Sequence, residues 1–257
     1  MNAYDDSKEF KSNCASQIDL QGKSQELVDL TKAWVRKAAE FNYSYHFEWL
    51  GRPIIQHPED MVGVQQLLWN IKPSIIIETG IARGGSLIFY SSILELIALC
   101  GGPQQARVIG IDVDIRAHNK QEVLNHPMSK RIEMIEGSSI DDDVISNVKS
   151  FISEGDTVLV CLDSLHTHDH VLEELRLYAP LVSKGSYCVV FDTIVEDMPD
   201  DAYPDRPWGI GNNPKTAVHQ FLEEDKAERG NARFEIDKAI ENQLLITVAP
   251  DGFLKRL

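Results

Sequence analysis

Four acidic residues each follow a short, mostly apolar run, and carboxylates in such positions can bind a ligand or a metal ion. They are Glu78, Asp112, Asp163 and Asp192, after the runs 75–77, 108–111, 157–162 and 187–191. Runs of this length that are rich in β-branched residues are typical of buried strands. Since the carboxyl ends of parallel strands meet at one edge of a sheet, we expect the four acids to lie close together.

The first of these acids opens a glycine-rich turn, which leads from Glu78 to Ser86 and into a long apolar stretch. A strand, a glycine-rich turn and a helix in this order form a binding site of the nucleotide type. The negative charge of Glu78 would repel a diphosphate, but it suits a cationic nucleoside that carries an amino acid. Five residues of the turn are therefore expected to bind such a cofactor: Glu78, Thr79, Gly80, Gly84 and Ser86. A tight turn without a ligand is the alternative.

The next two predicted strands supply groups that suit the nucleoside part of that cofactor. Asp112, with Val113 beside it, ends the second strand, and an acid there can accept hydrogen bonds from both ribose hydroxyls. Ser138 and Ser139 follow the third strand, and their small hydroxyl side chains suit an adenine edge.

Three histidines follow Asp163 within seven residues, in the segment Asp163-Ser164-Leu165-His166-Thr167-His168-Asp169-His170. An imidazole with an ordinary pKa of ~6.5 is suited to accept a hydroxyl proton near neutral pH. We expect His166 to be the general base, with His168 as the second candidate. His170 is expected to begin the following helix.

The spacing Glu-x-Gly-x-x-x-Gly-x-Ser from Glu78 to Ser86 is similar to the motif of catechol-type, metal-dependent O-methyltransferases. The longer pattern adds the segments 163–168 and 185–192 and extends from about Ile54 to the end of the chain. It resembles the cephalosporin-hydroxylase-like and rhamnosyl O-methyltransferase family. The resemblance implies a class I methyltransferase fold, which is a doubly wound, mostly parallel, seven-stranded Rossmann-like α/β sheet. It also implies S-adenosylmethionine at the strand ends, bound partly by Asp163, and often a divalent metal.

The resemblance further implies a site for Mg²⁺ or Mn²⁺ made of Asp163, Asp192 and Thr193. Catechol-type enzymes take their third ligand from the residue after the second aspartate, which is Thr193 in this chain. The hydroxylase-like relatives commonly place two adjacent acids at this strand end, whereas this chain has Phe191 before Asp192. Either acid of Glu196–Asp197 is an alternative source of the missing ligand.

The expected function is therefore methyl transfer from S-adenosylmethionine to a hydroxyl of a sugar or a small secondary metabolite. A non-haem-iron hydroxylase is one alternative, because His-x-His with nearby acids resembles its ligand set. That site normally has two histidines and one carboxylate on a β-rich scaffold, and it would leave Glu78 and Asp112 without a role. A protein that binds S-adenosylmethionine without catalysis is the other alternative.

The composition of the chain limits the kinds of partner that the protein is expected to bind. The 257 residues include 40 acids and 25 bases, which gives a net charge of −15 and disfavours nucleic acid. The four cysteines lack metal-ligand spacing. The first residues do not resemble a signal peptide, and no apolar run reaches the ~20 residues of a membrane span. We expect a cytoplasmic protein that forms homo-oligomers and does not bind membranes.

We expect the chain to be divided into two structural parts. Residues 1–53 should form an N-terminal arm with a helical and aromatic extension, and residues 54–257 the methyltransferase domain. Within the first part, residues 1–22 are polar and predict a loose arm or a segment that docks a partner. Ser24 is then a plausible N-cap for a helix from Gln25 to about Phe41.

The end of the chain contains a long loop and two further strands. Residues 194–214 hold four prolines and Trp208, which is typical of an active-site lid. Asn213 and Pro214 should begin a helix. The runs 234–237 and 244–248 are expected to be the last, antiparallel strands.

Overall fold

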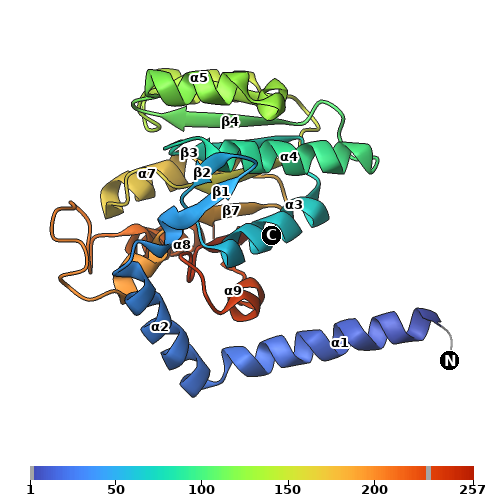
Figure 1. Ribbon diagram of the computed structural model, residues 1–257, viewed down its shortest axis with the longest axis vertical. Coiled ribbons are helices and arrows are strands. Elements are labelled where there is room, and N and C mark those ends of the chain that lie inside the picture. Colours follow the sequence, from blue (N-terminus) through green and yellow to red (C-terminus); the bar gives the residue numbers. More distant parts are fainter. Residues whose placement is uncertain (1–2, 230–232) are drawn as a thin grey trace.

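A computed structural model describes residues 3–229 and 233–257 of this protein. Seven strands form one sheet in the spatial order β5-β4-β3-β6-β7-β9-β8 (Figure 1). In chain order these strands are β3 (Ile75–Thr79), β4 (Arg107–Asp112), β5 (Ile132–Glu136), β6 (Val158–Leu162), β7 (Tyr187–Val190), β8 (Phe234–Ile236) and β9 (Phe253–Arg256). The first five are parallel and β9 is antiparallel to both of its neighbours. The predicted doubly wound sheet is confirmed.

Helices cover both faces of this sheet. They are α3 (Pro58–Ile71), α4 (Gly85–Leu99), α5 (Ala117–Asn125), α6 (Asp142–Ser150), α7 (His168–Tyr178), α8 (Pro214–Arg229) and α9 (Lys238–Leu244). Side chains of β3 alternate between two cores: Ile76 packs with residues of α3 and α4, whereas Ile75 and Ile77 pack with residues of α6, α7 and α8. Because every residue of β3 and β6 is buried, β6 is apolar throughout and β3 is apolar up to Glu78 and Thr79, instead of alternating with polar residues.

The register of the central strands brings their ends together. Thr79, the last residue of β3, lies opposite Ile111 of β4 on one side and Leu162 of β6 on the other. The amide of Asp163 then donates to the Thr79 carbonyl, at 2.9 Å. Asp112, the last residue of β4, and Asp163, which follows β6, therefore flank the glycine-rich turn.

The N-terminal residues are more ordered than their composition predicts. Residues Ala3–Gly22 form helix α1, whose C-terminal part packs against α9 (Figure 1), so the expectation of a loose arm is wrong for this segment. Its residues favour a helix because they include no proline and no β-branched run. Helix α2 (Gln25–Ala39) begins as predicted, with the Ser24 hydroxyl accepting from the amide of Leu27.

The aromatic segment forms a hairpin of β1 (Phe47–Trp49) and β2 (Arg52–Ile54), which packs on the start of α4. The Trp49 indole donates to the Ser92 hydroxyl at 2.9 Å. A Cβ atom on Gly85 would lie 2.1 Å from the Pro53 carbonyl oxygen, so β2 presses directly on the first turn of α4. The division of the chain at residue 53 stays a prediction.

The last strand differs from the prediction. Strand β8 lies within the predicted run, but residues 238–244 form α9, and the strand beside β7 is Phe253–Arg256. The apolar run 244–248 does not form a strand, because its polar groups bond elsewhere. Buried Asp60 accepts from the Thr247 hydroxyl and from the Val248 amide, at 2.9 Å for the amide. Within the described ranges, no helix combines the length and apolar character that crossing a membrane requires.

Replacing Asp60 by alanine should destabilise the protein, because the Thr247 hydroxyl and the Val248 amide would remain buried without their acceptor. We expect the free energy of unfolding to fall by about 1–3 kcal/mol in urea titrations. Glu133→Ala, which alters an exposed residue of β5, is the matched control and should change it by less than about 0.5 kcal/mol. Equal stability of the two variants would show that Asp60 does not fix the C-terminal segment.

Candidate functional site

The glycine-rich turn adopts a backbone that requires glycine. Gly80 and Gly84 have φ angles of +88° and +79°. A Cβ atom on Gly80 would lie 2.0 Å from the carbonyl oxygen of Asp163, so the turn and the end of β6 are in direct contact. One Asp112 carboxylate oxygen accepts from the amides of Ile81 and Ala82, at 2.9 and 3.2 Å. Asp112 therefore holds the turn in place, in addition to any contact with a cofactor.

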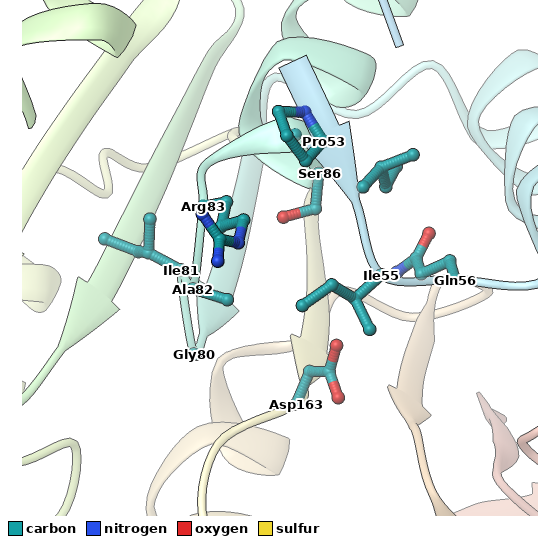
Figure 2. Close-up of a pocket in the computed structure, with 11 residues that line it drawn as sticks. Pro53, Ile55, Gln56, Gly80, Ile81, Ala82, Arg83, Ser86 and Asp163 are labelled. Carbon is teal, nitrogen blue, oxygen red and sulfur yellow. The ribbon is translucent and has the colours of Figure 1, made fainter. Parts of the chain in front are cut away.

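A cavity of about 310 Å³, including space open to solvent, lies against this turn (Figure 2). It is lined by Pro53–Gln56 of the β2–α3 segment, by Gly80–Arg83, Gly85 and Ser86, and by Asp163. Of the residues predicted to bind the cofactor, Gly80, Ser86 and Asp163 line it.

Glu78 lies behind the cavity wall and is fully buried. The Ser86 hydroxyl donates to its Oε2 atom at 2.7 Å, so Ser86 connects this carboxyl group to the cavity. Burial raises the pKa of Glu78 to about 8, and hydrogen bonding to Ser86 opposes that shift. Thr79 is buried beside it.

The residues predicted for the nucleoside lie further along the strand ends. Asp112 and Ser138 are half-buried, and Val113 is exposed. Ser139 is buried, and its hydroxyl donates to Glu174 at 2.6 Å, with His170 Nε2 at 3.2 Å. Ser139 thus belongs to a polar network with α7.

Three side chains from the ends of β6 and β7 converge on one point. One potential ligand atom each from Asp163, His166 and Asp192 lies within 4.8 Å of the other two. The Nε2 atom of His166 is 3.0 Å from Oδ2 of Asp192. Asp192 has a φ angle of +55°, a conformation that costs energy for a residue with a Cβ and is common at functional sites.

The charges around Asp163 are mostly negative. Burial raises the pKa of Asp163 well above its usual range, and the carboxylates of Asp192, Glu78, Glu174 and Asp60 raise it further. The pKa of Asp60 is itself raised to about 7, mainly by burial. Such an arrangement favours the binding of a cation, since a cation would stabilise the ionised carboxylates.

Thr193, the third predicted metal ligand, is fully buried, and its hydroxyl donates to the Pro250 carbonyl at 2.6 Å. The two alternatives also bond to other groups. Glu196 accepts from the Gly211 amide at 2.8 Å, and Asp197 forms ion pairs with Lys32 and Lys215. None of these three residues belongs to the cluster of Asp163, whereas His166 does.

The histidines of the 163–170 segment have different surroundings. Both ring nitrogens of His168 bond to α8, Nδ1 to Thr216 at 2.8 Å and Nε2 to Gln220 at 2.9 Å. His170 lies against Ser139 and Glu174 instead. Of the three imidazoles, that of His166 is the one beside Asp192.

The long loop after β7 contacts this cluster. The ring of Trp208 lies edge-on to that of His166, with centroids 4.8 Å apart and an interplanar angle of 85°. The guanidinium of Arg206 lies 5.2 Å from the centre of the Trp208 ring. The location of Trp208 fits the predicted lid, whose movement stays a prediction.

Sequence reasoning missed the contribution of the β2–α3 segment. Gln56, His57 and Asp60 are buried polar residues within five positions, and Gln56 lines the cavity. The available signal was the polar pair Gln56-His57 directly after the apolar pair Ile54-Ile55 and before the helix-starting Pro58.

Residues 41–257 match the family described as rhamnosyl O-methyltransferase/CmcI. The chain belongs to this family. A relative from Mycobacterium tuberculosis named rhamnosyl O-methyltransferase is 30% identical over 203 residues, which cover 77% of this chain and 73% of that protein. A protein of the same name from Mycobacterium leprae is 28% identical over 211 residues, covering 81% and 82% of the two chains.

Solved structures share the fold of this chain. CmcI with Mg and SAM has a TM-score of 0.54 and 19% identity, covering 83% of this chain and 77% of that one. The O-methyltransferase TomG from Streptomyces achromogenes, in complex with SAM, has a TM-score of 0.50 and 16% identity, covering 82% and 81%. The resemblance drawn from the strand-end motifs is thus confirmed, and family membership identifies the chain as an O-methyltransferase.

The raised pKa of Glu78 predicts how stability depends on pH. Between about pH 4.5 and about pH 8 the folded state keeps a proton that the unfolded state has lost. The free energy of unfolding should therefore fall with rising pH, with Glu78 contributing up to about 1.4 kcal/mol per pH unit.

Glu78→Gln should flatten this slope in urea titrations of the metal-free protein between about pH 5 and 8.5. Glu154→Gln, at an exposed position, is the control and should leave the slope unchanged. A Glu78→Gln slope equal to that of the wild type would contradict the assignment of a raised pKa to this residue.

Proposed function

We propose that this protein transfers a methyl group from S-adenosylmethionine to a hydroxyl of a sugar or small natural product, assisted by Mg²⁺ or Mn²⁺. The observation that carries the proposal is the position of Asp163, which both lines the cavity at the glycine-rich turn and belongs to the cluster with His166 and Asp192. A donor in the cavity and an acceptor at the cluster would be adjacent, as direct transfer requires.

The charge of the cavity suits this donor. S-adenosylmethionine carries a sulfonium and an ammonium group, and the carboxyl groups of Asp163 and Glu78 lie at or behind the cavity wall. The half-buried carboxylate of Asp112 holds the turn and retains acceptor capacity for ribose hydroxyls. The raised pKa values of Glu78 and Asp163 should fall when the cationic donor binds.

The residues of the cluster fit a divalent cation that prefers oxygen ligands. Asp163 and Asp192 would hold it, because their carboxylates converge and the charge of Asp192 raises the pKa of Asp163, which a cation would oppose. When bound, such an ion would orient the acceptor oxygen and lower its pKa.

His166 is suited to remove the acceptor proton. With the Nε2–H group donating to Asp192, the lone pair on Nδ1 is available to accept a proton from a hydroxyl. Asp192 would then orient the imidazole and stabilise its protonated form. The ring of Trp208 packs edge-on against the same imidazole. His168, whose two nitrogens bond to α8, suits a structural role.

The acceptor class follows from the relatives and from the surface charge. Two relatives are named rhamnosyl O-methyltransferases, which makes a sugar hydroxyl the first acceptor to test. A net charge of −15 disfavours large polyanions. Cytoplasmic location and homo-oligomer formation stay predictions.

Exhaustive chelation should abolish methyl transfer, and added Mg²⁺ or Mn²⁺ should restore it. Asp163→Asn and Asp192→Asn should each weaken metal binding measured by calorimetry, because a neutral amide is a poorer ligand for a hard cation. Asp142→Asn, at an exposed position on α6, is the matched control. Full activity after complete removal of divalent ions would rule out the metal role.

His166→Ala should lower kcat by about 10²–10⁴-fold while cofactor binding remains nearly unchanged, since the base acts in the chemical step. His168→Ala should lower kcat far less after correction for the folded fraction. If His166→Ala instead loses metal affinity, its imidazole is a ligand. If only His168→Ala loses activity, the base is His168.

The fold and the family favour neither of the two alternative functions considered for the sequence. A hydroxylase would consume oxygen with iron and 2-oxoglutarate, whereas its usual β-rich scaffold differs from this doubly wound sheet. A non-catalytic binding protein would take up S-adenosylmethionine without transferring its methyl group to any of a panel of sugar acceptors.

A further inference from the structure

Gln56 is a buried polar residue with no partner for its side-chain amide. Its exposed fraction is 3%, and neither Nε2 nor Oε1 has a hydrogen-bond partner among the described residues. A primary amide offers two donors and an acceptor oxygen. Because buried polar groups in folded proteins nearly always have partners, this amide is expected to bond to a ligand or to ordered water.

The residue that carries this buried amide borders a candidate ligand site. Gln56 lines the same cavity as the glycine-rich turn and Asp163, on the β2–α3 segment that approaches from a different part of the chain (Figure 2). This segment is held closely, since the Pro53 carbonyl lies against Gly85. The position of Gln56 relative to the turn is therefore fixed by backbone contact.

The groups around this cavity carry both signs of charge. Asp163 supplies a carboxyl group, Ser86 a hydroxyl that bonds to Glu78, and Arg83 an exposed guanidinium. The amides at the start of α4 are also suited to an anionic group. Asp112, Ser138 and Ser139, the groups expected at the nucleoside, are not among the residues that line the cavity. A zwitterion matches this combination better than a ribose or an adenine does.

We propose that Gln56 binds the amino-acid end of the methyl donor, with its carbonyl accepting from the ammonium group and its NH₂ donating to the carboxylate. The amide can serve both charges because it is a donor and an acceptor without net charge. This inference rests on the proposed function, because it assumes that S-adenosylmethionine is the donor. It assigns the cavity to the part of the donor that distinguishes it from simpler adenosine derivatives.

Two ligands distinguish binding of the amino-acid end by Gln56 from a general distortion of the site. S-adenosylhomocysteine has the amino-acid end and cannot transfer a methyl group, whereas 5′-methylthioadenosine has the same nucleoside without that end. In calorimetry, Gln56→Leu should bind S-adenosylhomocysteine about 10- to 100-fold more weakly, since hydrogen bonds to charged groups are lost. Its affinity for 5′-methylthioadenosine should stay within about twofold of wild type.

Gln66→Leu is the matched control, because Gln66 lies on α3 at an exposed position. If Gln56→Leu fails to fold, Gln56→Glu gives a second test at almost constant volume. A carboxylate at this position has no N–H group to donate to the carboxylate of the ligand, so S-adenosylhomocysteine binding should fall while 5′-methylthioadenosine binding is retained. Normal melting curves for the variants without ligand would show that the fold is intact.

Four outcomes would overturn the assignment. Equal weakening of both probes would place Gln56 at the nucleoside or show a general distortion. Unchanged affinity for both would show that the amide does not contact the ligand. A wild-type protein that binds 5′-methylthioadenosine as tightly as S-adenosylhomocysteine would refute an amino-acid subsite but leave the donor class possible. A wild type that binds neither would refute the proposed function, and with it the role of Gln56.

Discussion

Repulsion among carboxyl groups at the ends of the central strands is the constraint on which the site depends. Asp163 lies within the fields of Asp192, Glu78, Glu174 and Asp60, and its pKa is raised accordingly. Ionising these groups together requires compensating positive charge, which a divalent cation and a sulfonium donor would provide. The strands that end near Glu78, Asp163 and Asp192 are buried in two apolar cores, which stabilise the fold against this repulsion.

The same strands set the distance between the cavity at the glycine-rich turn and the cluster that contains Asp163. Gly80 contacts the backbone of Asp163 so closely that no Cβ atom fits between them. The glycine-rich turn and the cluster of Asp163, His166 and Asp192 are therefore adjacent. A larger residue at position 80 would separate a donor in the cavity from an acceptor at the cluster, and methyl transfer is sensitive to such separation.

Contacts outside the sheet select which polar residues face the site. Helix α8 bonds to His168, and α7 contributes His170 to a network with Ser139, which leaves the imidazole of His166 beside Asp192. The loop that carries Trp208 packs on the same imidazole. The β2–α3 segment contributes Gln56 from the opposite side of the cavity. Three segments remote in sequence thus enclose the strand ends.

The sequence by itself determined the five parallel strands of the sheet, the glycine-rich turn and the acids at the strand ends, because strand burial, positive φ angles and the position at a strand end are local properties that residue types encode. Only the tertiary structure decided the rest. The hydroxyl of Thr193 donates to the carbonyl of Pro250, fifty-seven positions away in sequence. The run 244–248 is held by Asp60, which lies about 190 positions before it. The cluster of His166 and the free amide of Gln56 likewise depend on contacts between distant segments, which no local pattern specifies.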